Sequence, residues 1–95
     1  MCDYELVAIV SPDASDDIVA GKIEGVSQLI AERNGEVEES QRWGKRRLAY
    51  PIKKYVEGNY SLMRFKLDPA DILPLRQNLE ADQDVLRYLI TKRGK

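Results

Sequence analysis

The side chains with the clearest capacity for chemistry lie between positions 42 and 55, where six basic and three aromatic residues share fourteen positions. A guanidinium can bind a phosphate through two parallel hydrogen bonds, and a Trp or Tyr ring offers a face on which an unpaired base can stack. This mixture favours an RNA-binding surface over the alternative, a solvated hairpin whose aromatic rings cover the sheet. The basic candidates for RNA contact are Arg42, Lys45, Arg46, Arg47, Lys53 and Lys54.

Catalytic and metal-binding sets of residues are missing from the sequence. It has no His, and its one Cys, Cys2, lies at the N-terminus, which we expect to be frayed. Because His is the usual general base near neutral pH and the commonest metal ligand, its absence excludes Ser-His-Asp, Cys-His and structural zinc sites. We therefore expect a protein that is not an enzyme and that uses no cofactor and no metal. A single Cys cannot form an internal disulfide, which fits a reducing compartment.

The acidic runs have structural explanations. Asp16 and Asp17 follow Ser15, and carboxylates at this position stabilise the positive end of a helix. Glu36 and Glu38 share one face of an expected strand, where the sequence provides no apolar pocket for acid–base chemistry. No glycine-rich phosphate-binding motif is present, so nucleotide binding has no support either.

The 95-residue chain has a formal net charge of -1, but this value conceals a division along the sequence. Residues 1–41 hold ten acidic and two basic residues, residues 42–66 hold one acidic and eight basic residues, and the rest balance five against five. Opposite blocks of this kind predict two opposite surfaces, of which the basic one is suited to a polyanion. Length and composition are typical of one globular domain covering residues 1–95.

The start of the sequence is acidic and has no apolar signal region. No segment approaches the roughly 18 consecutive apolar residues that a membrane-spanning helix needs. We therefore expect a cytoplasmic protein with no membrane partner.

The elements that would position these side chains begin with a strand and a helix. Residues 4–10 are nearly continuously apolar and rich in β-branched side chains, which predicts a central strand that is buried on both faces. Ser15 is suited to cap the start of the following helix, and Asn34-Gly35 to end it in a left-handed conformation. The apolar stripe of this helix would consist of Ile18, Val19, Ile23, Val26, Leu29 and Ile30.

Two strands are expected in the middle of the chain. Residues 36–48 have no helical period and carry many charges, which predicts a polar strand at the edge of a sheet. We expect a loop over residues 50–59. Residues 59–67 then alternate, which predicts a strand with one core face and one partly basic face.

A second helix and a last strand complete the chain. Asp68-Pro69 is a strong helix start, but Pro74 predicts either a kink or a later start near Leu73. Residues 85–91 read as the last strand, and residues 92–95 as a short basic tail.

The resulting order is β-α-β-β-α-β, which predicts an α+β, ferredoxin-like split β-α-β fold. Its four-stranded antiparallel sheet would carry both helices on one face and have the second strand at one edge. The other face of the sheet would stay open. Because this fold hosts RNA binders, metabolite-sensing domains and small enzymes, it does not decide the function.

The longest distinctive string runs from Trp43 through Gly-Lys-Arg-Arg-Leu-Ala-Tyr-Pro-Ile-Lys to Lys54. Together with Glu57-Gly58-Asn59-Tyr60, the ending Asp84-Val85-Leu86-Arg87-Tyr88-Leu89-Ile90 and the opening Tyr4-Glu5-Leu6, it resembles the bacterial small ribosomal subunit protein six family over nearly the whole chain. The resemblance implies a ferredoxin-like, RNA-binding ribosomal protein of the translation machinery. It would bind small-subunit ribosomal RNA together with small-subunit ribosomal protein eighteen, a small basic partner, and take no small-molecule substrate.

The resemblance also implies roles for individual side chains. The six basic residues of the 42–54 region become the RNA candidates, in agreement with the charge pattern. Residues implied for the protein partner, which would dock on the sheet and its edge strand, are Trp43, Leu48, Tyr50 and Tyr60.

Two other functions are compatible with the expected fold. A metabolite-sensing regulatory domain would bind a ligand at a homodimer sheet interface, but the sequence offers no pocket signature. An acylphosphatase-like enzyme would need a phosphate-binding loop with an Arg after the first strand, where this chain has Ser11-Pro12-Asp13.

Overall fold

The computed structural model describes residues 1–93. Gly94 and Lys95, half of the expected basic tail, lie outside the described residues. In chain order the elements are β1 (Cys2–Val10), α1 (Asp16–Glu32), β2 (Glu36–Ile52), β3 (Tyr55–Leu67), a 3₁₀ turn (Pro69–Asp71), α2 (Ile72–Ala81) and β4 (Val85–Arg93).

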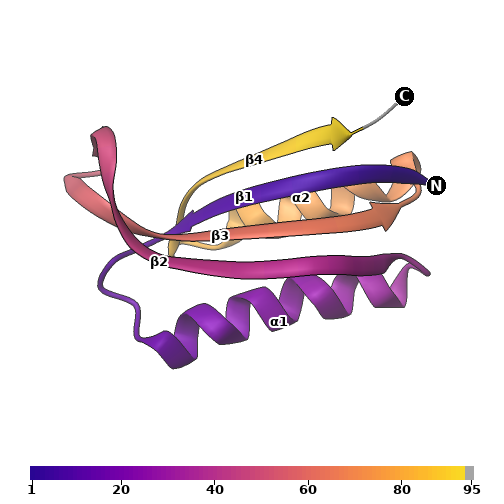
Figure 1. Ribbon diagram of the computed structural model, residues 1–95, viewed down its shortest axis with the longest axis horizontal. Coiled ribbons are helices and arrows are strands. Elements are labelled where there is room, and N and C mark those ends of the chain that lie inside the picture. The colour runs from indigo at the N-terminus through magenta and orange to yellow at the C-terminus, as the bar shows by residue number, and fades with distance from the viewer. Residues whose placement is uncertain (94–95) are drawn as a thin grey trace.

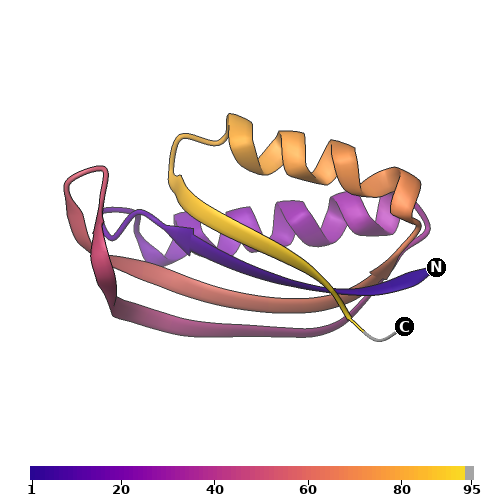
Figure 2. The same cartoon turned by 90° about the horizontal axis from the view of Figure 1, so that it is seen from above.

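All strand pairs are antiparallel, and the strands form one sheet in the order β2-β3-β1-β4 (Figure 1). Figure 2 shows α1 and α2 on the same side of this sheet. The predicted ferredoxin-like α+β fold is therefore confirmed, with β2 at one edge as expected.

The core lies between the helices and the sheet. Phe65 of β3 is fully buried at its centre, and its ring stacks on that of Tyr4 with 5.8 Å between the ring centres. Burial of each large apolar side chain stabilises the fold by roughly 1.5–3 kcal/mol, so this layer supplies most of the free energy that holds the helices to the sheet. Other buried members of the cluster include Leu6, Val26, Ile30, Met63, Leu75 and Leu79.

β1 is central, as predicted, but it is not buried on both faces. Tyr4 and Leu6 are buried beneath the helices, whereas Glu5 and Val7, which alternate with them along the strand, are only half-buried. The prediction of two buried faces was wrong because both helices lie on one side of the sheet, and of the β1 side chains on the other side only Ile9 is buried. Cys2 is not frayed, since it begins β1, pairs with Leu67 and packs against the core.

Both predicted ends of α1 are present. The Ser15 Oγ accepts a hydrogen bond from the Ile18 N–H at 3.3 Å. Asn34 takes the left-handed conformation with φ of 64°, and the N–H of Gly35 donates to the Ile30 carbonyl at 2.8 Å. The prediction that Ile18 belongs to the apolar stripe was wrong. Ile18 is exposed because it lies one position before the buried Val19, outside the face that meets the sheet.

The start of α2 agrees with the later of the two predicted positions. The Asp68 carboxylate accepts a hydrogen bond from the Ala70 N–H at 2.9 Å and caps the 3₁₀ turn, and the α-helix begins only at Ile72. Pro74 thus lies in the first turn of α2, where backbone N–H groups have no partner within the helix. Its missing N–H costs no helical hydrogen bond there.

The loop expected over residues 50–59 was wrong. β2 continues to Ile52 and β3 begins at Tyr55, so the connection is a two-residue turn. Lys53 and Lys54 form this turn with φ of 48° and 76°. Pro51 indicated a break, but proline is tolerated in an edge strand and at a bulge, and both conditions hold in this part of β2.

Candidate nucleic-acid interface

The β2–β3 hairpin extends beyond the rest of the sheet. The last β1 residue, Val10, pairs with Asn59, so the hairpin beyond that pair consists of β2 and β3 alone. The register shifts between the pairs Arg47–Glu57 and Ile52–Tyr55. Such an irregularity increases the bend and twist of a ribbon, and Figures 1 and 2 show the hairpin turning away from the line of the sheet.

A small apolar cluster holds the base of this hairpin. Leu48 of β2 is buried against Ile9 of β1 and Leu86 of β4, which brings three strands together. The half-buried side chains of Ile52, Tyr55 and Tyr60 pack around them. Beyond the last pair with β1, side-chain packing thus holds the hairpin against β1 and β4.

The hairpin carries a local surplus of positive charge. Lys45, Arg46, Arg47, Lys53 and Lys54 are all exposed, and within residues 1–93 none of them forms an ion pair. The one polar side-chain contact in this group is from the Arg46 Nε to the Trp43 carbonyl at 3.3 Å. Among the described residues, these five cations have no internal counterion and are available to an external anion.

The sixth RNA candidate, Arg42, differs from the other five. Its Nη2 lies 3.3 Å from a carboxylate oxygen of Asp16, at the start of α1. Because Asp16 is almost fully exposed, this pair is screened by water and worth at most about 1 kcal/mol. An RNA phosphate would therefore have to compete with only a weak internal partner at Arg42.

The acidic and basic blocks of the sequence do not form two separate surfaces. Acidic side chains from residues 1–41 neutralise three of the eight basic side chains in residues 42–66, so the remaining surplus is confined to the hairpin. The expectation of two opposite surfaces was wrong because neighbouring strands bring opposite charges into contact across the sheet. The cross-block pairs are Glu5–Arg64 at 3.0 Å, Glu39–Arg64 at 2.9 Å, Glu38–Lys66 at 3.7 Å and Asp16–Arg42 at 3.3 Å.

The four residues expected to contact a protein partner differ in solvent exposure. Trp43 is 42% exposed, and its Nε1 donates to Gln41 at 2.9 Å. Tyr50 is 55% exposed, while Tyr60 is half-buried. Leu48 is buried in the small cluster, so it supports the surface from beneath.

An apolar hollow of about 300 Å³ lies between the hairpin and β4 on the helix-free face. The wall of this hollow includes Leu89 and Arg87, which are not among the site residues predicted from the sequence. Leu89 is 62% exposed. Neither has a local signal in the sequence, because their importance comes from the bend of a distant hairpin. Residues that line the hollow include Val7, Ile9, Tyr50, Tyr60, Arg87 and Leu89.

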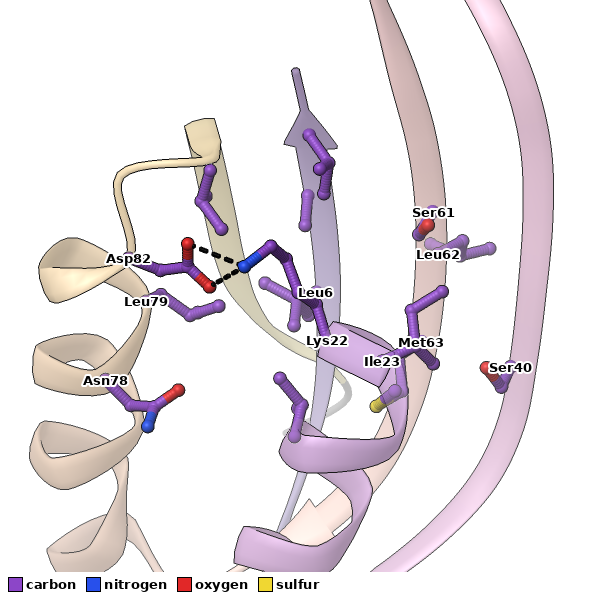
Figure 3. Close-up of a pocket in the computed structure, with 14 residues that line it drawn as sticks. Leu6, Lys22, Ile23, Ser40, Ser61, Leu62, Met63, Asn78, Leu79 and Asp82 are labelled. Atoms are coloured by element: carbon purple, nitrogen blue, oxygen red, sulfur yellow. Dashed lines mark hydrogen bonds and ion pairs between the residues drawn. The ribbon is translucent and has the colours of Figure 1, made fainter. Parts of the chain in front are cut away.

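A second cavity lies between the two helices and the sheet (Figure 3). Its volume of about 40 Å³ is far below the roughly 300–1,000 Å³ of small-molecule sites, so this cavity is too small to hold a metabolite. Ser61 contributes a buried Oγ to it that has no hydrogen-bond partner within residues 1–93. At one side Lys22 Nζ lies 2.6 Å from Asp82 and 3.3 Å from Asp84, and the hydrogen bond to Asp82 raises the pKa of Lys22.

The other shifted groups are also explained by structural contacts. Burial raises the pKa of Tyr4. The Tyr88 hydroxyl donates to Glu80 of α2 at 2.5 Å, and this hydrogen bond raises the pKa of Tyr88. A hydrogen bond to Glu5 likewise raises the pKa of Arg64. These groups tie elements together and do not converge on a reactive centre.

Within residues 1–93, no three His, Cys, Asp or Glu side chains are grouped so as to hold a metal ion. Neither helix in this part of the chain is long and apolar enough to cross a membrane. What distinguishes the surface is the cationic hairpin and the apolar hollow beside it.

Comparisons with known proteins agree on one family. The family model described as ribosomal protein S6 matches residues 3–92. The small ribosomal subunit protein bS6 of Moorella thermoacetica is 40% identical over 92 residues, which is 97% of this chain and 94% of that protein. The bS6 of Caldanaerobacter subterraneus subsp. tengcongensis is 42% identical, with 97% of each chain covered.

A solved structure shows the same relationship at the level of the fold. The crystal structure of 30S ribosomal protein S6 from Thermotoga maritima superposes with a TM-score of 0.92 at 28% sequence identity. The match covers 97% of this chain and 87% of that protein.

Proposed function

The chain belongs to the ribosomal protein S6 family, and on this premise we propose that its β2–β3 hairpin binds small-subunit ribosomal RNA while its sheet receives small-subunit ribosomal protein eighteen. Membership of the family makes the chain a constituent of the small ribosomal subunit, in the cytoplasm. Its relatives are structural proteins of the ribosome, which agrees with the expectation that it is not an enzyme.

The observation that carries the RNA proposal is the unneutralised charge of the hairpin. Three of the eight basic residues in residues 42–66 are paired within the protein, and the five that have no ion pair in the described chain lie between positions 45 and 54. Lys and Arg that neutralise phosphates release counterions, and this release drives binding with little dependence on base sequence. The function of the hairpin would thus be to anchor the folded RNA.

The open sheet face supports the proposed protein partner. Tyr50 and Leu89 present exposed apolar surface at the hollow, and Trp43 is exposed on the same strand as Tyr50. A docked protein would remove this surface from water. A basic partner would also be attracted by the acidic excess of residues 1–41. We propose Trp43, Tyr50 and Tyr60 as direct contacts, with Leu48 beneath them.

The two bound partners would act together. A chain with a net charge of -1 has little overall attraction for RNA, so binding by the hairpin alone should be weak. A second protein that contacts both this chain and the RNA would increase the affinity of each for the other. We therefore expect the protein heterodimer to form before or together with the RNA complex.

Titration of a central-domain fragment of small-subunit ribosomal RNA, with and without protein eighteen, tests this proposal. The expected result is weak binding by this chain alone and binding at least about tenfold tighter with the partner, which corresponds to a coupling free energy near 1.4 kcal/mol. Equally tight binding by this chain alone would contradict the cooperative part. Absence of binding under both conditions would contradict the RNA proposal itself.

A further inference from the structure

One side chain of β4 reaches the β2–β3 hairpin, although β4 is paired with β1 and not with either strand of the hairpin. The Arg87 Nη1 donates a hydrogen bond to the Tyr50 hydroxyl. The Cζ atom of the same guanidinium group lies 5.7 Å from the centre of the Tyr50 ring, within the range of a cation–π contact. Within residues 1–93 no carboxylate forms an ion pair with Arg87, so its polar contact there is with the hairpin rather than with an acidic neighbour.

This contact adds to the apolar packing that holds the hairpin in its orientation. Beyond Asn59, β3 pairs with β2 only, and an isolated two-stranded ribbon is marginally stable in water. The apolar contact of Leu48 with Ile9 and Leu86 anchors the base of the ribbon. Tyr50 lies two residues further out, between this cluster and the turn, where Arg87 contacts it.

The orientation matters for the cations that the hairpin carries. Arg46 and Arg47 precede Tyr50, and Lys53 and Lys54 follow it, so Tyr50 lies between the two groups of charges. If the ribbon swings freely, ordering it on RNA costs conformational entropy that reduces the affinity. A contact at Tyr50 limits that motion before the RNA arrives.

We propose that Arg87 is a positioning residue for RNA binding, which holds Tyr50 and thereby the whole hairpin in the orientation in which its cations contact the RNA backbone. The inference rests on the proposed function, since it assigns how the proposed RNA-binding hairpin is held. It gives Arg87 a role that does not require contact with RNA.

The competing possibility is that Arg87 binds a phosphate itself, and the salt dependence of binding separates the two roles. Loss of one phosphate contact makes the negative slope of log K against log salt concentration shallower by about 0.7–0.9. A lost positioning contact weakens binding but leaves the number of neutralised phosphates, and therefore the slope, unchanged.

The test compares the wild type with Arg87→Met, Tyr50→Phe and the double variant, in the RNA titration with protein eighteen present. Arg87→Met should weaken binding about 3- to 10-fold with an unchanged salt slope, in the range typical of coupled side chains. Tyr50→Phe removes only the hydroxyl group and keeps the ring, so it tests the same contact with a minimal change to the packing of the hairpin. Because both changes remove the same hydrogen bond, the double variant should bind more tightly than the product of the two single effects predicts, and a loss equal to that product would contradict the shared contact.

Arg93→Met is the matched control, because it removes the same charge from the opposite end of β4. It should leave affinity near the wild-type value. Unchanged affinity for Arg87→Met, or a salt slope reduced by one contact, would overturn the positioning role.

Amide hydrogen exchange without RNA separates this inference from the proposed function. In Arg87→Met, the amides of residues 48–57 should exchange several-fold faster than in the wild type, while the amides of α1 stay protected. Unchanged exchange in the hairpin would overturn the inference even if the wild type binds RNA. Failure of the wild type to bind RNA would overturn the proposed function, and with it the use of the hairpin's orientation, whatever the exchange shows.

Discussion

A Cβ atom built on Gly58 would lie 2.3 Å from the Cγ2 of Ile9, so the hairpin approaches β1 at a distance that only glycine allows. Gly58 does not have a positive φ, so the backbone conformation does not require glycine here. The close approach of Ile9 is therefore the reason for a glycine at this position. This contact belongs to the same cluster that buries Leu48.

Replacement of Gly58 by Ala should destabilise the protein by about 1–3 kcal/mol, because the added methyl group must displace Ile9 or move the hairpin. Chemical denaturation measures the effect. In an Ile9→Ala background the same substitution should cost less, since the clashing methyl group is gone. Equal costs in both backgrounds would show that Ile9 is not what Gly58 accommodates.

Ser61 and Asn59 of β3 should respond in opposite ways to substitution. The buried Ser61 Oγ has no hydrogen-bond partner in the described part of the chain. Ser61→Ala therefore removes an unsatisfied group and should be neutral or stabilise the protein by up to about 1 kcal/mol. The Asn59 Nδ2 donates to the Ser11 carbonyl at 2.9 Å, so Asn59→Ala should cost about 1–3 kcal/mol. Thermal unfolding of the two variants provides the comparison, and a clear loss of stability in Ser61→Ala would indicate that its hydroxyl is satisfied.

The ion pair between Lys22 and Asp82 predicts a loss of stability at alkaline pH. The hydrogen bond to Asp82 raises the pKa of Lys22 above its ordinary value of 10.5, so its contribution is fully present below that value and is lost as the pH rises through the higher folded-state pKa. Lys22→Met should lower the free energy of unfolding at pH 8 by roughly 0.5–1 kcal/mol. The difference between wild type and variant should shrink as the pH rises beyond this ordinary value and through the folded-state pKa. A difference that does not shrink at any alkaline pH at which the protein stays folded would contradict the assignment.

Substitution of the turn residues Lys53 and Lys54 should stabilise the folded protein but weaken its binding to RNA. Both residues have positive φ, a conformation for which Asn-Gly is the preferred pair in a two-residue hairpin. Replacement by Asn-Gly should therefore raise the free energy of unfolding by about 0.5–2 kcal/mol. It should also weaken RNA binding and lower the salt slope by about 2, because two cations are lost. Unchanged RNA affinity would remove the turn from the interface.

Much of the fold could be predicted from local patterns. The cap at Ser15, the left-handed Asn34 and the alternation of β3 are set by neighbouring residues, and all three are present. What failed depends on distant contacts. The second face of β1 looked buried because Val7 and Ile9 are apolar, yet only Ile9 is covered, by the returning hairpin.

The candidate site was predictable in composition but not in shape. The basic residues of the hairpin stand out in the sequence, whereas Pro51 and Gly58 indicated a loop where the structure has two strands. Glycine at position 58 is required by Ile9, which lies almost fifty positions earlier in the chain. Arg87 carries no local signal for the same reason, because its contact with Tyr50 exists only once the hairpin has bent toward β4.

Incorporation of Arg46→Glu, Arg47→Glu into reconstituted small subunits tests the role of the hairpin most directly. Both side chains are exposed and unpaired within the described chain, so the double variant should fold with a melting temperature close to that of the wild type. The matched control is Lys92→Glu, Arg93→Glu, which makes the same charge change at two adjacent exposed positions at the far end of β4. We expect the hairpin variant to be incorporated at least about tenfold less efficiently than the control, because two phosphate contacts become repulsive. Equal incorporation of the two folded variants would contradict RNA binding by the hairpin.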